Sequence, residues 1–214
     1  MYLKSGDRYS VLSRGLLTGT AINEDQSESG DVPRSDARYE GPLFNDMTAV
    51  LLTNAAVPKT SPQPSEPLSS RQQEEALRLA RRLFLDAGLA PSLVDPVKSR
   101  KIEMVRLLPN PKRKLVASFW IDRLHDSGIS HNLFVVADEQ HASFLPELVL
   151  LKISRTGTDG EQADLVDHAD LLRMGDDEIV TETTYYENYR YRIYRRGESG
   201  VWKKILESET LGCE

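Results

Sequence analysis

The feature that most constrains the fold is an alternation of side-chain types near the C-terminus, in which every second residue points to the same side of an extended chain. One set is Tyr189, Tyr191 and Ile193, and the other is Arg190, Arg192 and Tyr194. A period of two predicts a β-strand with one face packed and the other in water. Glycine-containing residues 197–200 and the run 201–206 follow, so the sequence predicts a hairpin.

The stretch before this hairpin reads as a strand, an acidic turn and a long strand. Residues 163–172 are apolar with spaced acids, and residues 178–196 are rich in Val, Ile, Thr and Tyr, which suit a pleated surface. Between them, residues 174–177 have turn chemistry, because glycine tolerates positive φ and aspartate bonds to nearby backbone groups. We therefore predict one continuous strand over residues 178–196.

Part of this stretch follows a known pattern. The matching residues are Asp170-Leu171, then Gly175, then Asp177-Glu178-Ile179-Val180. Over residues 164–196 the chain resembles a degenerate FG-GAP/VCBS-type repeat, the module with an Asp-rich calcium loop found in integrin-type propellers. The acids of this degenerate loop are Asp170, Asp176, Asp177 and Glu178. Calcium needs about six to eight oxygen ligands, but Leu172 and Met174 stand where two donors belong. The resemblance therefore implies the strand–loop–strand unit without a metal. It covers one repeat, whereas a propeller needs several.

Composition narrows the classes of protein that this chain can be. Its net charge of −6 and pI near 5.4 argue against general affinity for nucleic acid, because neutralising phosphates needs a basic surface. Cys213 is the single cysteine, so no disulfide can form within the chain. No apolar run is long enough to span a membrane. The location stays open between the cytoplasm and, after removal of a signal, an extracytoplasmic site.

Residues 71–87 predict one amphipathic helix. Ser70 is the expected N-cap, and Gln73 completes a capping box. Gly88 is expected to end the helix in the left-handed conformation. The apolar residues at helical spacing are Ala76, Leu77, Ala80, Leu83, Phe84 and Ala87. Such a stripe usually packs against a sheet rather than a partner protein.

Strand-like runs follow this helix at short intervals, at residues 97–108, 114–123, 131–137 and 144–154. Closely spaced strands joined by short turns indicate antiparallel pairing. We therefore predict an α+β fold: an antiparallel β-meander sheet covered by one amphipathic helix, with a short β-rich N-terminal segment.

Three regions are expected along the chain. Residues 1–57 form an N-terminal β/loop segment, with strands at 9–17 and 47–54 and an acidic loop at 23–38. Residues 58–69 form a proline-rich linker, for which a surface loop within one domain is an equally good interpretation. Residues 70–214 form the helix-plus-meander domain.

The C-terminal hairpin carries the most suggestive surface residues, because Tyr, Trp and Arg are enriched at binding hot spots. The candidate binding residues are Tyr189, Arg190, Tyr191, Arg192, Tyr194, Arg195 and Trp202. A structural alternative is that the aromatic residues form a packed face and the arginines a wet one. No catalytic motif is found, and no catalytic residue or cofactor is assigned.

Three functions follow from these observations. The first is a non-enzymatic binding or structural module, of bacterial type, that uses the hairpin for contact with a protein partner or for self-association. The second is a hydrolase-type enzyme with carboxylates near residues 167–178, which a pocket gathering two of those acids and a histidine would favour. The third is a nucleic-acid-binding hairpin, which a steep salt dependence of binding would reveal.

Overall fold

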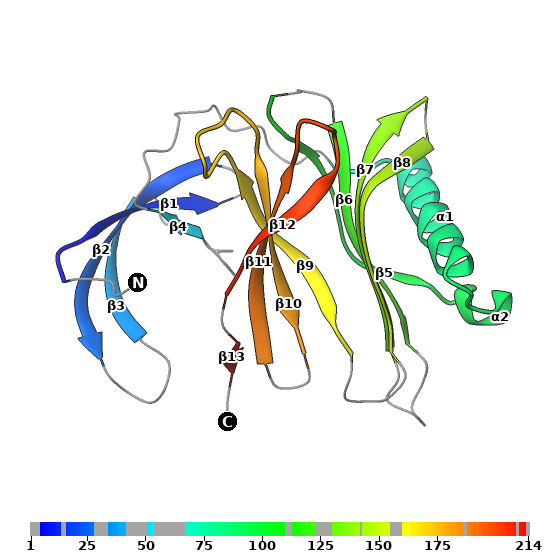
Figure 1. Ribbon diagram of the computed structural model, residues 1–214, viewed down its shortest axis with the longest axis horizontal. Coiled ribbons are helices and arrows are strands. Elements are labelled where there is room, and N and C mark those ends of the chain that lie inside the picture. The colour runs from blue at the N-terminus through cyan, green and yellow to red at the C-terminus, as the bar shows by residue number, and fades with distance from the viewer. Residues whose placement is uncertain are drawn as a thin grey trace.

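The computed structural model describes residues 5–13, 16–27, 34–41, 51–53, 67–109, 113–122, 130–141, 143–154, 160–185, 188–208 and 210–212. Within these ranges the chain is mostly antiparallel β-structure in three sheets, with one long helix (Figure 1). The prediction of a mainly antiparallel protein with one substantial helix is confirmed at this level. None of the described helices has the length and apolar character needed to cross a membrane.

The long helix α1 spans Ser70–Asp86 and is capped at both ends. Its N-cap is Ser69, which forms a capping box with Gln72, so the predicted cap at Ser70 is wrong by one residue. At the other end Gly88 has a φ of +89°, as predicted. The N–H of Leu89 donates to the Phe84 carbonyl at 3.2 Å, which completes a Schellman closure. A short helix, α2 (Pro91–Val94), follows.

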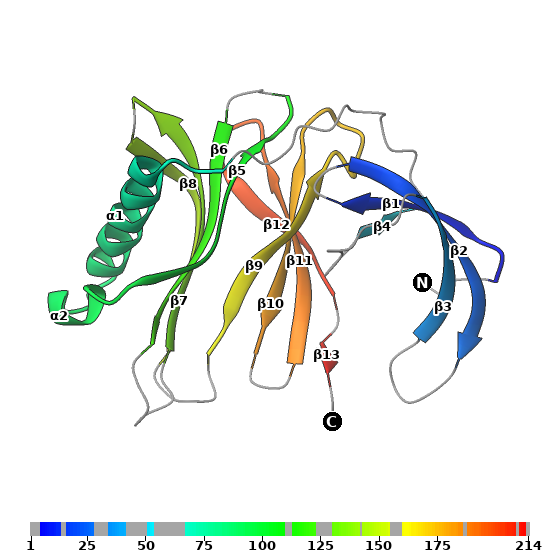
Figure 2. The same ribbon diagram turned by 180° about the vertical axis from the view of Figure 1, so that it is seen from behind.

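The first meander after the helices is a four-stranded sheet in the order β5-β6-β7-β8. Its strands are β5 (Lys98–Arg106), β6 (Arg113–Asp122), β7 (Ser130–Gln140) and β8 (Ser143–Ile153). Strand β7 is buried on both faces. Leu133 and Val135 share a core cluster with Phe84 of α1, whereas Phe134 packs in a second cluster with Tyr194. The helix lies beside this sheet in both views (Figures 1 and 2).

The second meander is a separate sheet in the order β12-β11-β10-β9, with a short β13 also paired to β11. Its strands are β9 (Gln162–Ala169), β10 (Glu178–Thr184), β11 (Asn188–Arg196), β12 (Trp202–Glu207) and β13 (Leu211–Gly212). The predicted single strand over 178–196 is therefore wrong. The chain reverses after β10, where the N–H of Tyr185 donates to the Asn188 carbonyl at 2.6 Å. The predicted hairpin at residues 197–200 is confirmed by the pairing of β11 with β12.

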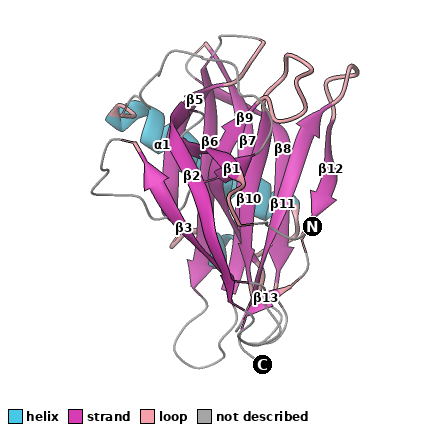
Figure 3. Cartoon of the chain, turned by 90° about the vertical axis from the view of Figure 1, so that its left-hand side faces the viewer, coloured by secondary structure: helices cyan, strands magenta, loops and turns pink. Residues whose placement is uncertain are grey.

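These two meanders pack face to face and share one core cluster, so they form a β-sandwich rather than one sheet. Ser118 of β6 donates a hydrogen bond to the Ala163 carbonyl of β9 at 2.9 Å. On the other side of the sandwich, Glu147 of β8 contacts Arg196 and Trp202. Seen from the side, the strands run in broadly similar directions, with the helix behind them (Figure 3).

The N-terminal strands form a third sheet in the order β3-β2-β1-β4. Its strands are β1 (Arg8–Ser13), β2 (Leu16–Ser27), β3 (Arg34–Glu40) and β4 (Leu51–Thr53). The predicted loop at 23–38 is wrong where it can be judged, because its two ends belong to β2 and β3. Residues 28–33 of that prediction lie outside the described residues, as do residues 58–66 of the proline-rich segment.

A tyrosine and a glycine explain part of the pairing of β2 with β3. The hydroxyl of Tyr39 donates to the Thr18 carbonyl at 2.9 Å. A Cβ at Gly19 would lie 2.6 Å from the Tyr39 ring and 2.6 Å from the Glu40 carbonyl oxygen. Only glycine fits there without displacing its neighbours, so the sheet depends on Gly19 for this close approach.

Candidate functional site

The two faces of the β11–β12 hairpin have different surroundings. Register pairs Tyr194 with Ile179 and Arg196 with Trp202, so these side chains share the inner face, which points toward β5–β8. Tyr194 and Trp202 are buried in the core between the two sheets. Two of the predicted binding residues are therefore core residues in this structure.

The arginines on the same inner face are paired with carboxylates. Arg192 contacts Glu161 and Glu207 and donates to the Tyr185 hydroxyl at 2.8 Å. Burial acts to lower the pKa of Arg192, but hydrogen bonding to Glu161 and its charge outweigh this and raise it. Arg190 pairs with Glu207 at 3.0 Å. Hydrogen bonds from Lys204 and Arg190 hold the pKa of Glu207 at about 2.

Arg195 lies on the outer face, 3.5 Å from Glu178 at the start of β10. The Glu178 side chain is fully buried, and burial raises its pKa. Its Oε2 accepts the backbone N–H groups of Leu171 at 2.7 Å and Leu172 at 3.3 Å. Glu178 therefore holds the preceding loop against the start of β10.

We call residues 170–178 the acidic loop. Asp170 of this loop also accepts hydrogen bonds from backbone N–H groups. The two carboxylate oxygens of Asp170 accept the N–H groups of Met174 at 2.8 Å and Gly175 at 3.0 Å. Leu172 and Met174 offer no side-chain oxygen. Among the described residues, no three His, Cys, Asp or Glu side chains lie close enough together to hold a metal ion. The residues of this loop therefore do not fit a calcium site.

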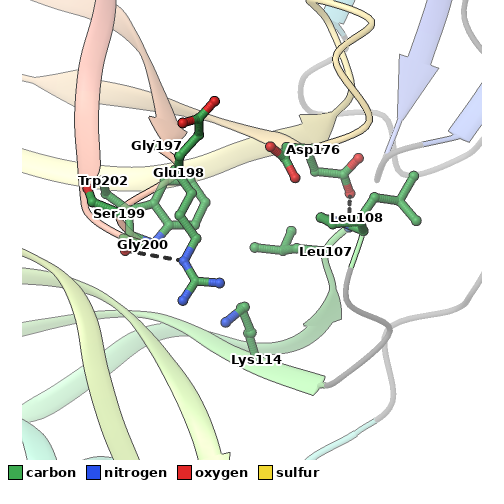
Figure 4. A pocket seen from close by; sticks show the side chains of 12 residues that line it. Leu107, Leu108, Lys114, Asp176, Gly197, Glu198, Ser199, Gly200 and Trp202 are labelled. Atoms are coloured by element: carbon green, nitrogen blue, oxygen red, sulfur yellow. Dashed lines mark hydrogen bonds between the residues drawn. The ribbon is translucent and has the colours of Figure 1, made fainter.

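A surface pocket of about 390 Å³ lies between the end of β5, the acidic loop and the β11–β12 turn (Figure 4). Its charged and aromatic lining residues are Lys114, Asp176, Asp177, Arg196, Glu198 and Trp202. The remaining lining is Leu107, Leu108, Pro109, Gly197, Ser199 and Gly200. A hollow of this size suits a small molecule or a single side chain of a partner.

Glu147 organises the inner wall of this pocket, although sequence reasoning did not select it. Register pairs Leu148 with Val136 and Pro146 with Ala137, so Glu147 is the extra residue of a β-bulge, a device that re-aims side chains. Its three donors are Lys114 Nζ at 2.9 Å, Arg196 Nη2 at 3.0 Å and Trp202 Nε1 at 3.3 Å. The sequence signal for Glu147 is that it follows Pro146 within an otherwise apolar run.

Lys114 is the most deeply buried cation of the cluster, with its side chain only 3% exposed. It pairs with Asp138 as well as with Glu147. Burial acts to raise the pKa of Asp138, but hydrogen bonding from Lys114 and its charge hold it below the ordinary value. The two cations Lys114 and Arg196 are thus balanced by two carboxylates.

Asp177 connects the acidic loop to the first meander. Its Oδ2 accepts the Leu108 N–H at 3.2 Å and lies 3.1 Å from His168 Nδ1. Its own N–H donates to the Leu108 carbonyl at 3.2 Å. The pocket gathers two acids of the loop, Asp176 and Asp177, and His168 contacts one of them without lining the pocket. These contacts join the acidic loop to His168 of β9 and to the chain that follows β5.

The outer face of the hairpin carries apolar groups beside Arg195 and Lys203; Tyr189 is exposed, whereas Tyr191 and Ile193 are partly buried. Tyr189 and Tyr191 pack edge to face with ring centroids 5.7 Å apart. Burial, with the charge and hydrogen bond of the cross-strand Glu182, raises the pKa of Tyr191 to about 12. Ile205 and Leu206 of β12 are 46% and 51% exposed. We call this surface the outer hairpin face; its members are Tyr189, Tyr191, Ile193 and Leu206, with Ile205 at the bulge beside Leu206.

Comparison with known proteins adds no relative. No family model matches the chain, and neither the curated proteins nor the solved structures contain a significant match.

Proposed function

We propose that the protein is a non-enzymatic binding module that contacts a protein partner through the outer hairpin face. The observation that carries this proposal is the exposure of Leu206, about half of the residue, on the face that also carries Tyr189 and Tyr191, with the equally exposed Ile205 at the adjoining bulge. Contiguous exposed apolar groups typically mark interaction surfaces. Tyrosine adds contact area with few rotatable bonds, which suits a binding hot spot.

The expected partner surface has an apolar centre bordered by carboxylates. Lys203 is exposed at the margin of the outer hairpin face, opposite Arg195 in the register. The Lys203 ammonium forms no ion pair with any residue that the structure describes, whereas Arg195 contacts Glu178. A partner carboxylate near Lys203 would gain a charge-assisted contact at the rim.

The face of the hairpin is a better docking surface than its edge. Register pairs Leu206 with Ile193 and Lys204 with Tyr194, which leaves Ile205 as a bulge in β12. Bulges and lysines on an edge strand discourage the addition of another strand. A partner that packs on the outward side chains is therefore favoured over one that extends the sheet.

The rest of the fold would hold the outer hairpin face in a fixed position for binding. In this proposal α1 covers the outside of the β5–β8 sheet, and the β9–β12 sheet carries the hairpin on the opposite side of the sandwich. The unit β9–loop–β10 is interpreted as a metal-free relative of the FG-GAP loop, in which Asp170 and Glu178 bind backbone N–H groups.

The two alternative functions have less support from the geometry. Asp177 is committed to Leu108 and His168, and Glu178 to the backbone of its loop, which leaves a hydrolase few free acids. The inner-face arginines are paired with carboxylates, which leaves little basic surface for nucleic acid.

Site-specific photo-crosslinking in the cell of origin tests the proposal. A photoreactive residue replaces Leu206 in one variant and Leu145 of β8, which is 52% exposed, in the control. We expect a discrete heteromeric adduct from position 206 that is lost when Ile205→Ser is added, and no such adduct from position 145. Equal adducts from both positions, or none, would refute the outer hairpin face as a docking site. An adduct with a second copy of this chain would refute a heteromeric partner.

A further inference from the structure

The pocket beside Trp202 has an excess of negative charge that the fold does not use. Lys114 and Arg196 are its cationic lining groups, and both already pair with Glu147, while Lys114 also pairs with Asp138. Asp176 and Glu198 are the remaining acids whose carboxylates form no ion pair with a residue in the described ranges. The electrostatic potential within the pocket is therefore negative.

The two free acids come from different turns that border the pocket. Asp176 belongs to the acidic loop, and Glu198 belongs to the β11–β12 turn (Figure 4). Both turns are held in place, because Asp177 bonds to Leu108 on one side and Arg196 Nε donates to the Gly200 carbonyl at 3.2 Å on the other. The carboxylates are thus carried by anchored turns rather than by free loops.

We infer that this pocket binds an organic cation, a primary ammonium or guanidinium group on an alkyl stem, through Asp176 and Glu198. The positive head lies between the two carboxylates, and the stem lies against the apolar lining of Leu107, Leu108 and Pro109. This inference does not depend on the protein partner proposed for the outer hairpin face, which lies on the other side of the same hairpin.

Two other ligand classes fit less well. An anion would meet Asp176, Asp177 and Glu198, while Lys114 and Arg196 are already neutralised. A metal ion would need three or more grouped ligands, and the described residues provide no such group. An alkyl cation needs only two carboxylates and an apolar wall, which are the groups present.

Tryptophan fluorescence offers a direct test, because Trp202 lines the pocket and the chain has two tryptophans. Replacing Trp120→Phe leaves Trp202 as the single reporter. Agmatine is the probe for a free amine, and Nα-acetyl-lysine methylamide is the probe for a lysine side chain of a protein. We expect saturable binding of at least one probe, and the tighter one identifies the source. Calorimetry with the unsubstituted protein repeats the measurement in case Trp120→Phe disturbs the fold.

Charge-removing substitutions then locate the site. We expect Asp176→Asn and Glu198→Gln each to weaken binding by roughly five-fold, and the double variant by about ten-fold or more. Asp86→Asn, an exposed acid on α1, is the matched control and leaves affinity unchanged. The inference is overturned if calorimetry shows no binding of either cation, if the double variant binds as well as the unsubstituted protein, or if succinate binds more tightly than both probes.

Discussion

The two faces of the β11–β12 hairpin differ in an unexpected way. The packed inner face carries most of the arginines, and the more exposed outer face carries aliphatic side chains. The inner face buries Tyr194 and Trp202 beside partly exposed arginines, and each of those arginines meets a carboxylate. The outer face leaves Ile205 and Leu206 accessible. An arginine can lie beside an apolar core when its charge is paired and hydrogen-bonded. The alternation therefore reveals a strand with two unlike faces, but it does not reveal which face is packed.

The largest expected difference between the faces comes from truncating one tyrosine on each. We expect Tyr194→Ala to lower the free energy of unfolding by about 3–5 kcal/mol, because it empties a site in the core between the sheets. Tyr189→Ala on the outer face is expected to cost less than about 1 kcal/mol. Urea denaturation of the two variants measures the contrast, and similar losses would contradict the assignment of faces.

The next effect comes from the carboxylate that receives three donors on the inner side. Glu147→Ala is expected to destabilise the protein by about 2–4 kcal/mol, because Lys114 and Arg196 lose a buried partner. Adding Lys114→Met is expected to restore part of the loss, since without Glu147 the two cations are balanced by Asp138 alone. A double-mutant cycle in urea gives the coupling free energy. Purely additive losses would show that the pair does not interact energetically.

A smaller, pH-dependent effect is expected at the edge of the inner face. The pKa of Glu207 is about 2 in the folded protein, against an ordinary value of 4.5. Its ionised form therefore stabilises the fold above pH 4.5, and that contribution is lost as the pH falls toward 2. Thermal unfolding of Glu207→Gln and the unsubstituted protein is expected to differ most near neutrality and to converge in acid. A constant difference across this range would contradict the assignment.

The smallest expected effect is a titration on the outer face. The raised pKa of Tyr191, about 12, predicts that one tyrosine ionises well above the ordinary value of 10. Because the neutral phenol is favoured in the folded state, stability is complete below pH 10 and declines as the pH approaches 12. Burial also raises the pKa of Tyr194, so ultraviolet titration is expected to show a smaller late component in Tyr191→Phe and an unchanged one in Tyr189→Phe. An undiminished late component in Tyr191→Phe would contradict the raised pKa of Tyr191.

The helix shows both the reach and the limit of sequence reasoning. Its existence, apolar stripe and glycine end were predictable from helical periodicity. The cap was not, because Ser69 with Gln72 and Ser70 with Gln73 are two equivalent capping boxes one residue apart. Local sequence could not choose between them.

The strands show a different limit. Strand β10 ends at Thr184 and β11 begins at Asn188, and the sequence between them contains neither glycine nor proline. The unbroken apolar run of β7 does indicate a second layer, because a strand buried on both faces needs packed structure on each side. The pairing of β2 with β3 has a weak sequence signal, because its cross-strand contacts mix the apolar pair Ala21–Tyr39 with the ion pair of Arg38 and Glu24.

The candidate site was predictable only in part. Tyr189 and Tyr191 were selected for their type, and they do lie on an accessible face. Ile205, Leu206 and Glu147 were missed, because their roles depend on bulges in β12 and β8, and a bulge has no reliable sequence signal.

The bulge at Glu147 has a consequence for how the sandwich comes apart. One carboxylate joins donors from β6, β11 and β12, and therefore joins both sheets. Pulling either sheet away would break a largely buried cluster of hydrogen-bonded ion pairs, so partial separation is penalised from the first step. We expect the two meanders to exchange their most protected amide protons at a common rate, as one cooperative unit.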